Sequence, residues 1–228
     1  MPQVLFPVPI WNKSNAFSKE EIELGISLSY EFKRTSNKYG PASLVSHGWN
    51  QKKSSYDFKD FHKDGITSFN NLDLLEEKKW LPISKAIQIQ ALKLLSDIWI
   101  VKDFRLDHLW TTIYPKGGFI PIHNHAPYLL SGVCYLQTPE DCGKLVFQDP
   151  SWTTKAQSPF RESTFPILGT QQKIEPKAGD IFLFPVGCHI GLSQINQIKT
   201  GLSCLLIWFF LVLPNCGYNR KDNSGCFF

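Results

Sequence analysis

The stretch Ile120–Leu136, IPIHNHAPYLLSGVCYL, decides the fold and the chemistry that this sequence predicts. It opens as an extended apolar segment that ends in two histidines, His123 and His125, two positions apart. Alternate residues of a strand point to the same face, so both imidazoles can aim at one point. Imidazole nitrogens bind iron, zinc, copper and nickel. The pair therefore indicates a metal site, although such histidines also occur as ordinary surface or core residues.

A third histidine, His189, follows another predicted strand within GDIFLFPVGCHIGLS, residues 179–193. Three protein ligands with other positions left open are typical of a catalytic metal rather than a closed structural one. Asp149, at the end of a further predicted strand, is a candidate alternative oxygen ligand. A turn-forming aspartate before Pro150 is the more ordinary interpretation of that residue.

Length and composition favour one folded unit. The 228 residues fit a single domain over 1–228, and an aromatic content of 14% argues against disorder. We expect a helical and loop layer over residues 1–104, a β core over 105–214 and a C-terminal tail over 215–228. The net charge of +4 comes without a long basic run, so it indicates no nucleic-acid partner.

The cysteines and the apolar segments bear on location. The six cysteines contain no C-x-x-C pair, which argues against a structural zinc site. The N-terminus lacks the features of a secretory signal, and the apolar run 202–213 is too short to cross a bilayer. We therefore expect reduced thiols, a cytoplasmic protein without a membrane partner, and a strand at 202–213 that is buried on both faces.

Helices are predicted first and strands second. A capping box at Ser18 opens a helix to about Arg34, and an apolar stripe predicts another over 83–98. Residues 4–11 read as an edge strand or extended arm, and the polar and aromatic residues 35–75 as part of a lid over the substrate site. Strands are predicted over 106–114, 119–123, 130–136, 144–148, 172–175, 180–185, 189–194 and 202–213.

Eight short strands separated by turn residues are typical of a jelly roll. The predicted fold is therefore α+β but mostly β, with a cupin-like double-stranded β-helix core and N-terminal helices packed on one face. In this architecture the strands that carry His123 and His189 are neighbours, so the three imidazoles can meet.

Taken together, the motifs resemble the iron(II)/2-oxoglutarate-dependent oxygenase superfamily, most closely a subgroup from marine bacteria and their phages, and their order is similar to that of prolyl hydroxylases. The residues that carry the resemblance are Gly48–Trp49, Trp110, Gly118, His123–Pro127, Ser131–Leu136, Gly143–Pro150, Gly179–Pro185 and His189.

The resemblance implies Fe(II) on His123, His125 and His189, with 2-oxoglutarate and O2 as co-substrates. Such enzymes convert 2-oxoglutarate to succinate and carbon dioxide while they hydroxylate a C–H bond; the primary substrate stays unnamed. His125 stands where the family has a carboxylate.

The family's anchor for the distal carboxylate of 2-oxoglutarate is also different. The usual arginine or lysine slot, two residues before Ser203, is Gly201. Lys199 and Lys144 are candidate replacements, since a lysine is a cation without arginine's bidentate fork. Tyr135 is a candidate hydrogen-bond partner of the same carboxylate. Solvated surface lysines and a core tyrosine are the ordinary alternatives.

Two other functions stay open at this point. A three-histidine dioxygenase of cupin type would bind its substrate directly and need no 2-oxoglutarate. A jelly-roll binding protein that has lost iron chemistry would also lack the carboxylate and the arginine. The three histidines at usable spacing favour an enzyme over the binding protein.

Overall fold

The computed structural model describes residues 8–35, 66–69, 72–96, 104–114, 116–125, 128–149, 171–195 and 203–212, and two helices precede the run of strands that begins at residue 105. Helix α1 (Lys19–Thr35) begins at the predicted capping box: the Glu21 carboxylate accepts from the Ser18 backbone N–H at 2.8 Å, and the Ser18 hydroxyl accepts from the Glu21 N–H at 3.2 Å. Two short 3-10 turns, η2 (Leu74–Glu76) and η3 (Lys78–Trp80), lead into helix α2 (Leu81–Leu95).

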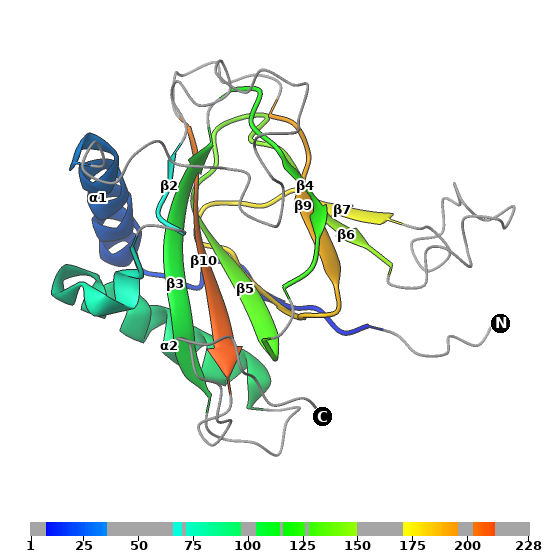
Figure 1. Cartoon of the computed structure of the whole chain (residues 1–228), viewed down its shortest axis with the longest axis horizontal. Coiled ribbons are helices and arrows are strands. Elements are labelled where there is room, and N and C mark those ends of the chain that lie inside the picture. Colours follow the sequence, from blue (N-terminus) through cyan, green and yellow to red (C-terminus); the bar gives the residue numbers. More distant parts are fainter. Residues whose placement is uncertain are drawn as a thin grey trace, which may run out of the picture.

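The strands form two antiparallel sheets. A six-stranded sheet has the order β1-β8-β5-β10-β3-β2, and a four-stranded sheet has the order β4-β9-β6-β7. From β3 onward the chain passes repeatedly from one sheet to the other, which stacks the sheets face to face (Figure 1). The strands are β1 (Trp11–Lys13), β2 (Ile66–Thr67), β3 (Arg105–Tyr114), β4 (Ile120–His123), β5 (Leu130–Gln137), β6 (Leu145–Gln148), β7 (Gln171–Ile174), β8 (Ile181–Pro185), β9 (His189–Leu192) and β10 (Cys204–Val212).

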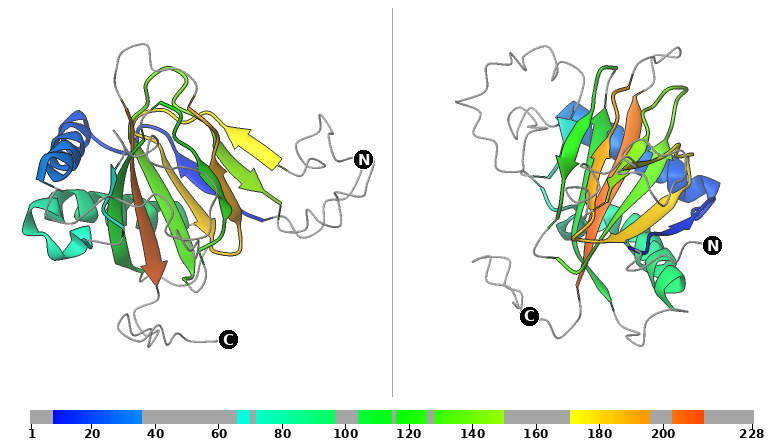
Figure 2. Two further views of the ribbon diagram at one scale, coloured as in Figure 1. Left: turned by 45° about the horizontal axis from the view of Figure 1, so that its top comes forward. Right: turned by 90° about the vertical axis from the view of Figure 1, so that its right-hand side faces the viewer.

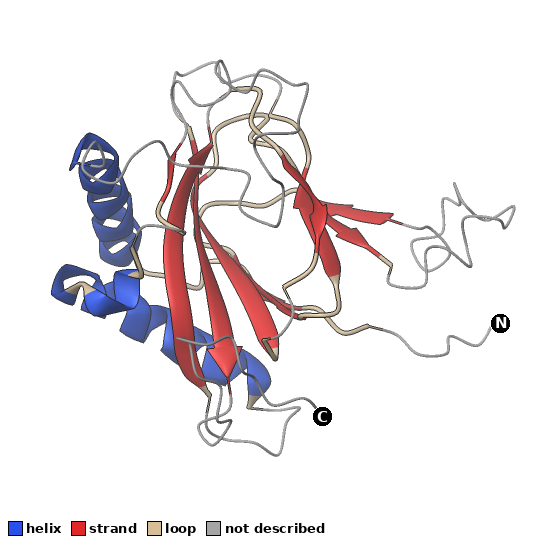
Figure 3. Ribbon diagram, in the orientation of Figure 1, coloured by secondary structure: helices blue, strands red, loops and turns tan. Residues whose placement is uncertain are grey.

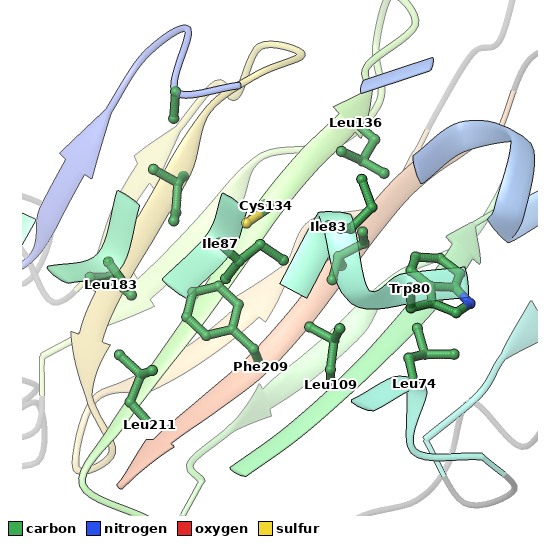
Figure 4. Close-up of a cluster of buried hydrophobic side chains, with 14 of the residues drawn as sticks. Leu74, Trp80, Ile83, Ile87, Leu109, Cys134, Leu136, Leu183, Phe209 and Leu211 are labelled. Atoms are coloured by element: carbon green, nitrogen blue, oxygen red, sulfur yellow. The ribbon is translucent and has the colours of Figure 1, made fainter. Parts of the chain in front are cut away.

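The helices cover one face of the larger sheet, and the smaller sheet covers the other (Figure 3). Strand β10 separates the two cores, and all nine of its residues are buried. Because side chains alternate along a strand, Phe209 packs in the helix-side core while Trp208 and Phe210 pack between the sheets. Figure 4 shows Phe209 on the helix side of the sheet with Ile87 of α2 and Leu109 of β3.

The predicted order of elements is confirmed, and the bounds differ slightly. Helix α2 starts at Leu81, two residues before the predicted start, because Pro82 is tolerated in the first turn of a helix. All eight predicted strands are present with ends shifted by one or two residues. At the sheet edge the described strand is β1, at 11–13 rather than 4–11; residues 1–7 lie outside the described residues.

The predicted lid over residues 35–75 is described only in part. Of the predicted lid, residues 36–65 lie outside the described residues, and the remainder includes β2 and η2. Neither helix in the described ranges is both long and apolar enough to cross a membrane. The two views in Figure 2 place both helices beside the larger sheet.

Substitution of Gly132 in β5 tests the packing around Phe209. A Cβ at this position would lie 2.1 Å from the nearest atom of the Phe209 ring, which is fully buried and cannot move aside without cost. We expect Gly132→Ala to lower the free energy of unfolding by about 1–3 kcal/mol, measured by urea denaturation. Gly187→Ala is the matched control, because a Cβ there meets nothing within 4 Å and should change stability little. Equal stability of the two variants would contradict the packing described here.

Candidate metal and co-substrate site

His123 is the last residue of β4, which pairs with β9 through His123 and Ile190. Its Nδ1 lies 2.8 Å from the Pro121 carbonyl oxygen. A carbonyl can only accept, so Nδ1 carries the proton and Nε2 presents a lone pair in the neutral ring. Burial lowers the pKa of the His123 imidazole, and this effect outweighs the backbone hydrogen bonds with Pro121 and Ile190, which raise it. The site therefore favours the neutral ring, which is the form that binds metals.

His125 lies just beyond the end of β4, yet its Nε2 is 2.8 Å from the Nε2 of His123. Two lone pairs at this distance repel, so a proton or a cation between them is needed. Two nitrogens bound at about 2.0–2.1 Å and at right angles to one metal ion lie about 3 Å apart. The separation thus fits both a shared proton in the metal-free protein and a shared metal ion.

Ser131, at the start of β5, can form a hydrogen bond with either neutral tautomer of His125. Its Oγ lies 2.8 Å from the His125 Nδ1, and both groups are buried. A hydroxyl can donate to an unprotonated Nδ1 or accept from a protonated one. In the metal-free protein Ser131 donates and the His125 Nε2–H is shared with His123. With Ser131 accepting instead, the His125 Nε2 would present a lone pair to a cation, so the serine supports both tautomers.

Aromatic rings enclose His125, which is only 4% exposed. The ring centroids of Phe210, Phe184 and Trp208 lie 5.1, 6.1 and 6.1 Å from that of His125. Water is therefore largely kept from this side of the imidazole pair. A dry surrounding strengthens electrostatic interactions with any ion held there.

His189 opens β9 on the strand next to His123 and is half-buried. Its Nδ1 is buried and has no hydrogen-bond partner in the ranges that the structure describes. Within those ranges, no three His, Cys, Asp or Glu side chains are grouped closely enough to hold a metal ion. The structure thus brings two of the predicted ligands together and places the third on the neighbouring strand, so the three-histidine site stays a prediction.

The other predicted site residues fall in different surroundings. Asp149 follows β6 and is half-buried, and it joins no metal-binding group among the described residues. Lys144 has a 52% exposed side chain and its Nζ lies 3.8 Å from a Glu175 carboxylate oxygen. This outward position does not favour Lys144 as a co-substrate anchor. Lys199 lies outside the described residues.

Tyr135 is fully buried between the sheets, where its ring contacts Phe182 edge-on at 6.1 Å. Burial raises the pKa of its phenol well above the ordinary value, so the group is neutral and can donate. The hydroxyl nevertheless has no hydrogen-bond partner in the described part of the chain. An unsatisfied buried donor costs about 1–3 kcal/mol, so this position fits a bound acceptor such as a carboxylate.

The sequence alone gave no role to Ser131. Its hydrogen bond to His125 joins residues on either side of the β4–β5 connection and appears only in the folded chain. The aromatic enclosure of His125 is likewise built from β8 and β10, which lie far from it in the sequence.

A family model covers the strands that carry this site. Residues 108–191 match the family described as "Putative 2OG-Fe(II) oxygenase". No curated protein is similar to the chain in sequence.

Solved structures share the fold at low identity. A prolyl-4-hydroxylase from Pseudomonas putida is 16% identical, with 90% of this chain and 93% of that chain covered and a TM-score of 0.52. HygX from Streptomyces hygroscopicus, with nickel, 2-oxoglutarate and hygromycin B bound, is 14% identical, with 95% and 90% covered and a TM-score of 0.56. A Trichoplax adhaerens prolyl hydroxylase in complex with a peptide fragment of hypoxia inducible factor is 12% identical, with 88% and 82% covered and a TM-score of 0.54.

At these identities the structures show a common fold and no more. The family match is the more specific finding, because it spans His123, His125 and His189 and the strands that position them. By that match, the region from residue 108 to residue 191 is similar to the 2OG-Fe(II) oxygenase family.

Proposed function

We propose that the chain is an Fe(II)- and 2-oxoglutarate-dependent oxygenase of the hydroxylase type, acting with O2 on a substrate that the site does not name. The observation that carries the proposal is the 2.8 Å approach of the His123 and His125 Nε2 atoms within the region that the family model covers. We interpret the alternation of strands between the two sheets as a jelly roll that folds as one unit over residues 1–228.

His123, His125 and His189 are the proposed iron ligands, in an H-x-H…H variant of the site. The first two already converge, and the buried Nδ1 of His189 is on the neighbouring strand. Bound Fe(II) with 2-oxoglutarate and O2 would supply the oxidising power for C–H hydroxylation, with succinate and carbon dioxide as co-products. The protein's own part is to orient the imidazoles, through Pro121 and Ser131, and to exclude water through the aromatic rings.

Tyr135 is the proposed hydrogen-bond donor to the 2-oxoglutarate carboxylate, because its buried hydroxyl is unsatisfied among the described residues. None of the lysines and arginines in the described ranges is buried. We therefore propose Lys199, in preference to Lys144, as the cation that binds the distal carboxylate of 2-oxoglutarate.

One observation also fits a second function. Because the described residues place no cation between the sheets, a three-histidine dioxygenase that needs no 2-oxoglutarate fits the same imidazoles. The unsatisfied Tyr135 hydroxyl favours the 2-oxoglutarate-dependent enzyme, because a carboxylate bound between the sheets would accept a hydrogen bond from this buried donor.

The direct test is an anaerobic titration of the Fe(II)-loaded protein with 2-oxoglutarate. We expect a weak, saturable visible charge-transfer band that is lost in His189→Ala and weakened in Lys199→Ala. Lys144→Ala is the matched control, and the band should persist in it because that side chain is exposed. Bound iron without any band would contradict 2-oxoglutarate dependence and favour the three-histidine dioxygenase.

Ser131→Ala tests the orientation of His125. Without the hydroxyl, the Nδ1 of His125 loses its 2.8 Å partner, and the imidazole loses its fixed tautomer. Removal of such an outer partner typically weakens metal affinity about 10–100-fold. Competition with a fluorescent chelator measures this change, with Ser84→Ala as the control because its hydroxyl bonds to Leu81 in α2. Unchanged affinity in Ser131→Ala would remove the serine from the account.

Tyr135→Phe should act in opposite directions on stability and on ligand binding. Deleting an unsatisfied buried hydroxyl should raise the free energy of unfolding of the ligand-free protein by about 1 kcal/mol. The same change should weaken 2-oxoglutarate binding about 10-fold or more, because a hydrogen bond to a charged group is lost. Thermal unfolding and calorimetric titration measure the two effects.

Tyr30→Phe is the control, since the Tyr30 hydroxyl accepts from Gln137 at 3.1 Å and its loss should lower stability without changing 2-oxoglutarate affinity. If Tyr135→Phe instead destabilised the protein and left binding intact, the tyrosine would be a core residue only.

A further inference from the structure

We infer that His108, held in place by Asp73, contacts the primary substrate of the proposed oxygenase and accepts a hydrogen bond from it. The substrate class is a molecule with a hydroxyl or N–H donor next to an apolar ring or alkyl face. This inference rests on the proposed function, because it assumes that a substrate approaches the His123–His125 pair.

Asp73 fixes the His108 ring from the side. The His108 Nδ1 lies 3.2 Å from Asp73 Oδ2, and the Asp73 side chain is only 10% exposed. The other carboxylate oxygen accepts the backbone N–H groups of Leu75 at 3.1 Å and Leu109 at 3.2 Å. Although burial alone would raise the pKa of Asp73, the hydrogen bonds from His108 and the two backbone groups lower it. The carboxylate is thus ionised and immobile.

This pairing sets the role of the other ring nitrogen. When the neutral His108 donates from Nδ1 to Asp73, its Nε2 is an acceptor. The side chain of His108 is 19% exposed, and no described residue is recorded as a partner of Nε2. The nitrogen is therefore available to a donor that arrives from outside.

Strand register places His108 in line with the imidazole pair. His108 of β3 lies opposite Phe210 of β10, and Phe210 lies opposite Ser131 of β5. Ser131 in turn bonds to His125. Because neighbouring strands are about 4.7–4.9 Å apart, His108 is about 10 Å along the sheet from the residue that orients His125. A substrate of modest size can span that distance.

Aromatic rings lie between the two histidines. The Phe210 ring stacks on His108 at 6.2 Å and contacts His125 at 5.1 Å. Tyr128 stacks on Phe210 at 3.8 Å, and Phe69 contacts the edge of His108 at 5.4 Å. Such surfaces favour a flat or apolar partner. A single oriented acceptor in an aromatic surrounding is the arrangement that selects a donor group on an apolar body.

A purely structural role explains Asp73 better than it explains His108. Asp73 caps η2 and satisfies the Leu109 N–H of β3 without any help from the imidazole. A phenylalanine at position 108 would keep the ring contacts with Phe69, Trp110 and Phe210. The two roles can therefore be separated by a variant that retains the ring and removes the nitrogens.

The test uses the full chain loaded with Zn(II), which imidazoles also bind and which is diamagnetic. Phenol and anisole are the probes: both carry an aromatic ring, and only phenol has a donor. NMR titration should show that His108→Phe weakens phenol binding about 2- to 10-fold, the range of one neutral hydrogen bond, and leaves anisole unchanged. Long-range 1H–15N spectra should show His108 protonated at Nδ1 in the wild type, and Asp73→Asn should change this tautomer.

Phe69→Leu is the matched control, because it trims the aromatic surface and should weaken both probes equally. Phenol affinity that is unchanged in His108→Phe would overturn the inference. Binding of benzoate in preference to phenol that depends on His108 would also overturn it, because it would show that His108 acts as a cationic donor. Neither result depends on turnover. A normal 2-oxoglutarate band with no phenol effect would refute the inference alone, whereas a missing band with a His108-dependent phenol effect would refute the proposed function alone.

Discussion

The His123 and His125 imidazoles approach each other closely, and the groups around them are arranged about that contact. The His123 and His125 Nε2 atoms lie 2.8 Å apart, aromatic rings enclose His125, and each ring is fixed from behind by a separate oxygen. Neither nitrogen can turn away, because the Pro121 carbonyl and the Ser131 hydroxyl hold the opposite sides of the rings. The protein thus keeps a position at which only a proton or a cation relieves the repulsion of two lone pairs.

Strand β10 makes this arrangement possible because it serves two cores at once. Phe209 joins the sheet to the helices, while Trp208 and Phe210 face the smaller sheet and enclose His125. Any shift of the strand by one residue would exchange these faces. The helix layer therefore contributes to the site indirectly, by fixing the register of the strand that keeps water from the imidazole pair.

The sequence predicted the elements well because burial and alternation are local signals. It also placed β4 beside β9, so the histidines could be grouped before the structure was known. The directions of single side chains were harder to predict. His125 lies past the end of β4, so strand alternation alone does not account for the 2.8 Å approach of its Nε2 to that of His123. The buried neighbours Leu145 and Phe147 place Lys144 on the outer face, and the pairing of Asp73 with His108 exists only in the folded chain.

X-ray absorption of the anaerobic Fe(II)-loaded protein shows whether three imidazoles share one metal ion. We expect scattering from three imidazole nitrogens at the distance of a metal–histidine bond, and from two in His189→Ala. Three imidazoles that persist in His189→Ala would contradict the ligand set. An iron environment of oxygen atoms alone would show that the His123–His125 pair shares a proton and holds no metal.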